Sequence, residues 1–172
     1  AQALRRLLPR GDQVVLVERE ESHVFAPSLL WLMVGERTAE AISRPVAHAV
    51  REGIELVRGD VTALDPAART VRVGQQSLQG DAIVIALGAQ YAPQAIPGLA
   101  EAGLCLYTLA GATAIREALE RVERGRLAVL TAAPAYKCPA APYEAALLVD
   151  NFLRKRGCRD KVTMDFYAAE PG

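Results

Sequence analysis

Residues 13–18, QVVLVE, and residues 81–88, DAIVIALG, set the fold class of this chain. Each is a short apolar run rich in β-branched residues, and Gly88 ends the second one. Such runs are typical of strands that a parallel sheet buries on both faces. Strands that alternate with helices predict a doubly wound α/β architecture. The remaining elements that we expect are strands at 54–57, 126–131 and 162–167, and helices at 1–9, 44–52 (capped by Ser43), 112–124 and 143–156.

Residues 61–79 depart from this alternation. Apolar and polar residues alternate there on both sides of a turn at Asp65-Pro66, which predicts a β-meander inserted in the first unit. We expect two units, residues 1–100 and residues 101–172. The chain starts without Met inside a helical pattern and ends after a strand-like run, so we expect a fragment truncated at both ends.

Composition excludes several classes of protein. The chain has 172 residues, 20 basic and 20 acidic, for a formal net charge of zero. A nucleic-acid-binding domain normally carries a basic excess, so we expect no nucleic-acid partner. Hydrophobic residues make up 51%, which is enough for a folded core. Three cysteines argue against a disulfide scaffold and favour a reducing compartment, and we expect a cytoplasmic protein.

Glu18, at the end of the first strand, is the first candidate for ligand binding. A carboxylate at this position of a mononucleotide-binding unit accepts hydrogen bonds from the ribose hydroxyls of an adenine dinucleotide. The glycine-rich loop that should precede it by about 20 residues would fall before Ala1. A solvated glutamate at a strand end is the alternative. His23 and His48 lie apart from other ligand types, so we expect no metal site.

The stretch 130–144, LTAAPAYKCPAAPYE, connects a strand to a helix without a single glycine. A nicotinamide dinucleotide needs close approach of backbone N–H groups at this position, and Pro139 and Pro142 remove two of them. The loop therefore disfavours NAD(P)H. It carries Cys138 instead, next to Lys137 and near a helix N-terminus, a setting that favours the nucleophilic thiolate. An inert small residue in a tight loop remains open as an alternative.

Together these motifs resemble the FAD-binding half of the two-dinucleotide-binding-domain flavoproteins, the disulfide-reductase superfamily. DAIVIALGAQ (81–90) is similar to the motif D-x-L-V-I-A-T-G-A, with Leu87 at the usual Thr, and GDV (59–61) and IPG (96–98) also match. The resemblance implies two Rossmann-like units: an FAD-binding domain (1–100) lacking its first strand and glycine loop, and the start of an NAD(P)-binding-like domain (101–172) with a degenerate loop. It implies FAD in the full-length protein, and we expect none in an isolated, inactive fragment. The cofactor-binding residues implied are Glu18, Arg19, Val61, Ala86, Leu87 and Gly88.

Two further stretches resemble the sulfide:quinone oxidoreductases and the flavoprotein subunit of flavocytochrome c sulfide dehydrogenase. These are C-P-x-A-P-Y-E from Cys138, and FAPSLLWLMVG over 25–35. The resemblance implies that Cys138 is one of a redox pair beside the flavin, that its partner lies in the C-terminal half, and that Cys138 takes up sulfide as a persulfide. Cys105 matches a third, sulfur-carrying cysteine, although its apolar context also fits a buried small residue. We interpret Cys158 as incidental, and Phe25 and Trp31 as core.

The implied substrates are sulfide and a quinone. Two alternatives remain: a flavocytochrome c subunit that donates to haem, and a type II NADH:quinone reductase that uses NADH. In this family, membrane contact is peripheral and comes from the C-terminal region, which this sequence does not include. An oligomer is left open.

Overall fold

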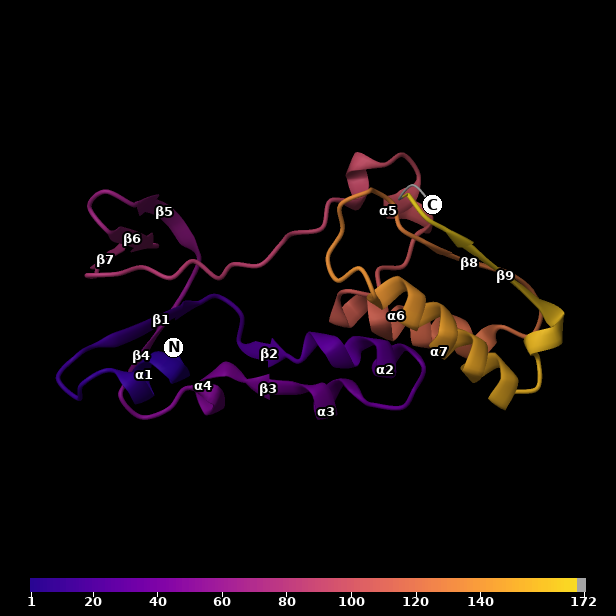
Figure 1. The fold of residues 1–172 in the computed structure, drawn as a ribbon, viewed down its shortest axis with the longest axis horizontal. Coiled ribbons are helices and arrows are strands. Elements are labelled where there is room, and N and C mark those ends of the chain that lie inside the picture. Colours follow the sequence, from indigo (N-terminus) through magenta and orange to yellow (C-terminus); the bar gives the residue numbers. More distant parts are fainter. Residues whose placement is uncertain (170–172) are drawn as a thin grey trace. The chain divides into compact units, whose positions relative to one another are not determined.

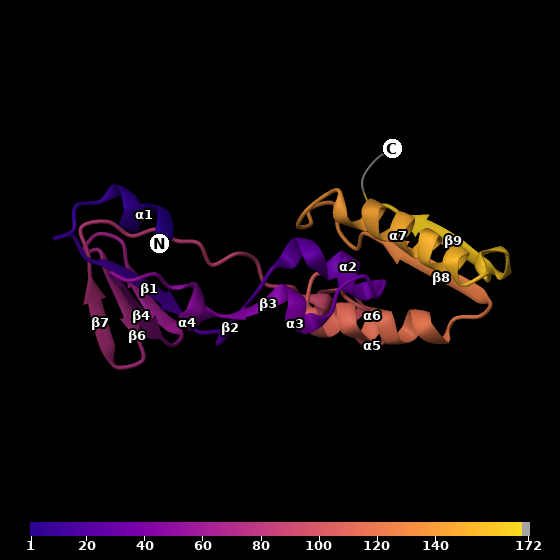
Figure 2. The same ribbon diagram turned by 90° about the horizontal axis from the view of Figure 1, so that it is seen from below.

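The computed structural model describes residues 1–169, and the chain divides into two compact units. Unit 1 contains residues 1–24 and 43–88, and unit 2 contains residues 25–42 and everything described from Ala89 onward. Figure 1 labels the elements along the chain, and Figure 2 shows the same ribbon after a rotation of 90°. The domain boundary expected near residue 100 stays a prediction.

Unit 1 is built on a parallel strand pair. β1 and β4 run in register from Val14 opposite Ile54 to Glu18 opposite Arg58, and Val14, Ile54 and Val57 are buried. The apolar run at 13–18 thus forms the expected strand. The elements of unit 1 are α1 (Gln2–Leu7), β1 (Val14–Glu18), β2 (Ser22–Val24), β3 (Ser43–Pro45), α4 (Val46–Ala49), β4 (Ile54–Arg58), β5 (Val61–Asp65), β6 (Thr70–Val73) and β7 (Gln76–Gln79).

The expected meander is confirmed as the antiparallel sheet β5-β6-β7. Its first turn is closed by the Asp65 carboxylate, which accepts a hydrogen bond from the backbone N–H of Ala68 at 2.9 Å. Gly59, which precedes β5, has φ 146°, and a Cβ at this position would lie 2.7 Å from Cγ1 of Val73. A residue with a Cβ would therefore have to displace the Val73 side chain and adopt a backbone conformation that favours glycine.

Unit 2 repeats the parallel pairing. β8 and β9 pair in register from Gly125 opposite Val162 to Leu130 opposite Tyr167, and α7 joins them and contacts β8 (Figure 2). α7 buries Ala145, Val149 and Leu153, which are spaced by one helical turn. The elements are η1 (Ala26–Ser28), α2 (Leu29–Met33), α3 (Ala39–Ile42), η2 (Pro93–Ala95), α5 (Leu99–Ala102), α6 (Leu109–Arg121), β8 (Gly125–Leu130), α7 (Ala141–Lys155), η3 (Arg159–Lys161) and β9 (Val162–Tyr167).

Two expected elements differ in the structure. Residues 81–86 form no strand, and Val84 and Ile85 are 75% and 63% exposed. A strand needs a hydrogen-bonded neighbour, and none of the described strands pairs with this segment. The helix expected over 44–52 is reduced to α4, because Ser43–Pro45 pairs with β2 as a strand and Ser43 does not cap the helix.

Candidate functional site

The first group of candidate residues lies where β1 and β4 end. The backbone N–H of Gly59 donates to the carbonyl of Glu18 at 3.3 Å, and the Arg19 guanidinium lies 3.6 Å from the Asp60 carboxylate. Val61 follows directly as the first residue of β5. We call Glu18, Arg19 and Gly59–Val61 the β1–β4 edge. Ligands of open α/β sheets bind at the carboxyl ends of parallel strands, so this edge is in a suitable place for a ligand.

The Glu18 side chain suits the ribose end of an adenine dinucleotide. It is partly exposed, and Oε1 accepts a hydrogen bond from the backbone N–H of Glu20 at 2.9 Å, which fixes its direction. A carboxylate has about four lone-pair sites, so acceptors remain for two hydroxyl groups. The acceptor oxygens of Glu18 and the glycine at position 59 therefore fit the ribose end of FAD, the cofactor that the family resemblance implies.

The segment 86–88 follows the meander in irregular backbone. Gly88 has φ 73°, and the space where its Cβ would lie is open within 4 Å. Leu87 is 80% exposed. This backbone can be approached closely by a ligand. Contact of Ala86, Leu87 and Gly88 with the cofactor stays a prediction.

The second group of candidate residues lies in the β8–α7 loop, residues 131–140. Cys138 is exposed, and it adopts φ 55°, in the left-handed region that residues with a Cβ rarely occupy. Its carbonyl accepts a hydrogen bond from the backbone N–H of Ala141 at 3.0 Å, at the start of α7. Strained backbone of this kind is concentrated at functional sites, which makes Cys138 the strongest nucleophile candidate in the loop.

Two stacked tyrosines that the sequence analysis did not single out contact Lys137 and Cys138 of this loop. The Tyr107 hydroxyl donates a long hydrogen bond, 3.5 Å, to the carbonyl of Cys138. The Tyr107 ring stacks on Tyr91, with centroids 5.6 Å apart and an interplanar angle of 13°. Lys137 Nζ lies 5.9 Å from the centroid of the Tyr91 ring. The only sequence signal was the presence of aromatic residues near candidate cysteines in a chain with 5% aromatic residues.

Burial raises the pKa of Tyr107 to about 12, and the negative charge of Cys138 adds to this effect, followed by Tyr91 and Cys105. The hydroxyl therefore stays protonated, and a donor, throughout the physiological pH range. Cys105 precedes Tyr107 by two residues along the chain, and the Tyr107 hydroxyl reaches the Cys138 carbonyl at 3.5 Å.

The other two cysteines differ in their surroundings. Cys105 is partly buried. A Cβ at position 111 would lie 1.9 Å from the Cys105 carbonyl oxygen, so only glycine at this position of α6 allows the helix to pack so close to the Cys105 backbone. Cys158 is 7% exposed, and its Sγ lies 3.8 Å from the carbonyl oxygens of Val122 and Leu153. Its environment is that of a packed core residue, in agreement with the incidental role expected for it.

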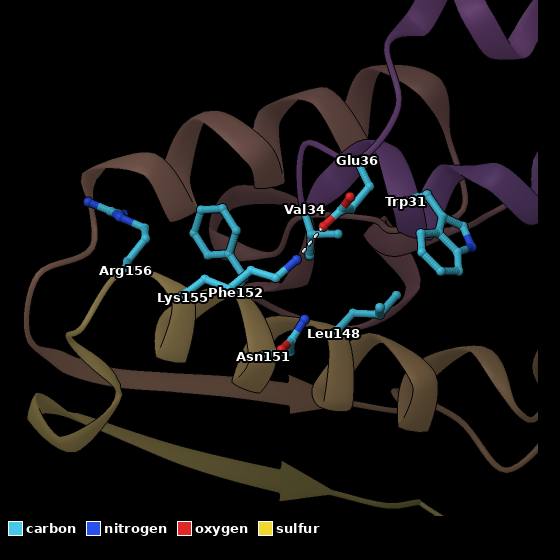
Figure 3. A pocket seen from close by; sticks show the side chains of 8 residues that line it. All are labelled: Trp31, Val34, Glu36, Leu148, Asn151, Phe152, Lys155 and Arg156. Carbon is cyan, nitrogen blue, oxygen red and sulfur yellow. Dashed lines mark hydrogen bonds and ion pairs between the residues drawn. The ribbon is translucent and has the colours of Figure 1, made fainter.

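A hollow of about 510 Å³ lies beside α7 (Figure 3). Lys155 and Glu36 form an ion pair across it, with Nζ and Oε1 2.7 Å apart. The interpretation of Trp31 and Phe25 as core residues is wrong, because they are 41% and 56% exposed. Trp31 lines the hollow together with Val34, Glu36, Leu148, Asn151, Phe152, Lys155 and Arg156. None of these lining residues is a thiol, so the hollow offers no redox group.

Residues 1–169 carry neither a cluster of metal-ligating side chains nor a helix suited to span a membrane. Within that range, no three His, Cys, Asp or Glu side chains gather where they could hold a metal ion. The helices of the same range are all too short or too polar to span a bilayer.

Comparisons with known proteins show which family of proteins the chain is similar to. The family model described as "Pyridine nucleotide-disulphide oxidoreductase" matches residues 1–132. The chain is 30% identical over 171 residues to the "Sulfide-quinone reductase" of Aquifex aeolicus, covering 98% of this chain and 39% of that protein. It is 27% identical over 169 residues to the mitochondrial "Sulfide:quinone oxidoreductase" of Dictyostelium discoideum, covering 93% of this chain and 37% of the relative.

The chain is also similar in structure to one of these relatives. The crystal structure of the sulfide:quinone oxidoreductase from Aquifex aeolicus superposes with a TM-score of 0.87 at 30% identity, covering 98% of this chain and 39% of the other. This likeness confirms the expected α/β architecture. The chain spans well under half the length of the relatives that it matches.

Proposed function

Because the chain belongs to the pyridine nucleotide-disulphide oxidoreductase family, we propose that its parent protein is an FAD-dependent enzyme that oxidises sulfide and reduces a quinone. The observation that carries this proposal is Cys138, an exposed thiol on left-handed backbone in a glycine-free strand-to-helix loop. The names of the relatives support the choice of sulfide and quinone.

The β1–β4 edge would hold the adenosine end of FAD. Glu18 would bind the ribose hydroxyls, and Arg19 and the backbone around Val61 would border the adenine. Ala86, Leu87 and Gly88 would let the backbone approach the cofactor. The flavin, when bound, supplies a two-electron acceptor that no amino-acid side chain replaces.

Cys138 would carry the sulfur chemistry with a second cysteine, which the family resemblance puts outside this chain. A hydrosulfide ion attacks the disulfide between the two, the S–S bond breaks, and one cysteine receives the sulfur as a persulfide. The other cysteine leaves as a thiolate. Oxidation of each hydrosulfide to the sulfane level releases two electrons and one proton, and the two electrons would leave the cysteine pair for the flavin and then the quinone, which would return the pair to the oxidised state for the next hydrosulfide. Cys105, two residues before Tyr107, is proposed to accept sulfur from this pair.

The β8–α7 loop also supports sulfide over a nicotinamide dinucleotide as the electron donor. Residues 130–144 contain no glycine, and each glycine that a dinucleotide-binding loop would have is replaced by a residue whose Cβ hinders close approach of a phosphate. Pro142 lies in the first turn of α7, where it removes a backbone donor that a phosphate would otherwise use. The helix start is therefore poorly equipped for a dinucleotide.

Cys138→Ala in the natural full-length protein tests the proposal. We expect reduction of the bound flavin by sulfide to slow by about a thousandfold or more, because the nucleophile is lost. Cys158→Ala, which removes a buried thiol away from the loop, should leave the rate within about twofold. Sulfide-dependent reduction that survives in Cys138→Ala would contradict the proposed role.

We further propose a cytoplasmic enzyme that meets the membrane peripherally, through a region beyond this chain. The low count of three cysteines suits a reducing compartment. Because a quinone is lipid-soluble, an enzyme that reduces it must reach the bilayer surface. Fractionation of cells, with and without a high-salt wash of the membranes, tests this proposal.

A further inference from the structure

Tyr107 connects the β8–α7 loop to the segment that precedes α6. It precedes α6, whereas Cys138 is 31 residues further along the chain. The hydroxyl of Tyr107 nevertheless reaches the carbonyl of Cys138 at 3.5 Å. That carbonyl also accepts from the backbone N–H of Ala141 at 3.0 Å, so both of its lone pairs have a donor.

The ring of Tyr107 is itself held in place. It stacks on Tyr91 at 5.6 Å, and Lys137, the neighbour of Cys138, lies over the Tyr91 ring. The Tyr91 hydroxyl is buried and has no hydrogen-bond partner within the described residues, so Tyr91 contributes through its ring. The loop is thus attached at two consecutive residues to one aromatic pair.

We infer that Tyr107 is a positioning residue for Cys138: stacked on Tyr91 and bonded to the Cys138 carbonyl, it holds the loop in the conformation that presents the thiol. This inference rests on the proposed function of Cys138. The left-handed backbone at Cys138 is unfavourable for a residue with a Cβ, so interactions outside the loop must maintain it. Tyr107 supplies such an interaction, and as a protonated hydroxyl it does so without titrating near neutral pH.

Tyr107→Phe in the full-length protein removes the hydroxyl and keeps the stacked ring. We expect kcat for sulfide-dependent quinone reduction to fall about tenfold, since a displaced nucleophile loses its alignment. KM for the quinone, the FAD content and the melting temperature should not change, and a variant that merely damaged the fold would alter them. Tyr143→Phe is the matched control, because Tyr143 is also a stacked tyrosine of unit 2, paired with Phe166 at 4.6 Å.

A second readout does not depend on turnover. In protein whose disulfides have first been reduced with dithiothreitol and the reductant removed, the rate at which iodoacetamide alkylates Cys138, followed by mass spectrometry of its peptide at one fixed pH, should change at least about threefold in Tyr107→Phe and not in Tyr143→Phe. If the wild-type protein fails to oxidise sulfide but alkylation still depends on Tyr107, the proposed function is wrong and the positioning role stands. If sulfide turnover is present, and both kcat and alkylation in Tyr107→Phe stay within twofold of wild type, the positioning role is overturned and the function stands.

Discussion

The β1–β4 edge and the β8–α7 loop both follow the carboxyl end of a parallel strand, but they differ in which residue adopts the rare backbone. At the β1–β4 edge, Gly59 has the positive φ, and its backbone N–H donates to the carbonyl of Glu18, whose carboxylate is the candidate ribose ligand. In the β8–α7 loop, cysteine takes it, and the loop has no glycine. The same architectural position therefore suits a dinucleotide in one unit and a thiol nucleophile in the other.

Cys138→Gly separates the strain of the loop from its chemistry, and we expect it to have the largest effect. Glycine tolerates φ 55°, so the free energy of unfolding should rise by about 1 kcal/mol, measured by urea denaturation. Sulfide oxidation should fall by about a thousandfold or more in the same protein. Cys138→Ala should lose the activity without the gain in stability. Equal stability of the two variants would show that the backbone at Cys138 is not strained.

Glu18→Gln tests whether the β1–β4 edge binds the dinucleotide. Loss of a charged acceptor for the ribose hydroxyls should weaken FAD binding about 10- to 100-fold, measured by fluorescence titration of the apoprotein. Glu20→Gln removes the same charge two residues away and serves as the control. Should both variants retain FAD equally well, Glu18 would not be a cofactor ligand.

Gly59→Ala addresses the close packing at the β1–β4 edge. The new Cβ would meet Val73 Cγ1 at 2.7 Å on backbone with φ 146°, so we expect a loss of about 1–3 kcal/mol in the free energy of unfolding. Gly74→Ala is the control, because Gly74 also has positive φ, 58°, but nothing lies within 4 Å of its Cβ position. A smaller loss for Gly59→Ala than for Gly74→Ala would contradict the steric argument.

Asp150→Asn should have the smallest effect, and only on unit 2. Hydrogen bonds from Arg154 and Arg159 hold the pKa of Asp150 below its ordinary value of 3.8. A lowered pKa in the folded state gives stability that is present above pH 3.8 and is lost as the pH falls through the folded value. The melting temperatures of wild type and Asp150→Asn should therefore differ slightly near neutral pH and converge in acid. A difference that grows on acidification would reverse the sign of this argument.

The elements that could be predicted from the sequence are those that depend on a local pattern of apolar and polar residues. The strand at 13–18, the meander and the parallel pair β8–β9 formed as expected, and the family match confirms the resemblance. Contacts between distant residues were missed. Residues 81–86 have the composition of a strand but no described strand to pair with, and Ser43 pairs with β2 where a helix cap was expected.

The candidate site likewise contains residues that a local pattern predicts and residues that only contacts between distant parts of the chain reveal. Glu18 and Cys138 could be proposed from the sequence because their places after apolar strands can be read along the chain. Tyr91 and Tyr107 were not found, because nothing local connects Tyr107 to a carbonyl 31 residues away. The exposure of Phe25 and Trp31 likewise depends on packing between elements, which periodicity does not reveal.

The most direct test of the account is an anaerobic titration of the full-length flavoprotein, in which flavin absorbance is followed while sulfide is added to one sample and NADH to another. The account predicts bleaching by sulfide and none by NADH, because the β8–α7 loop presents Cys138 and lacks the glycines that a nicotinamide dinucleotide needs. Bleaching by NADH and none by sulfide would contradict it.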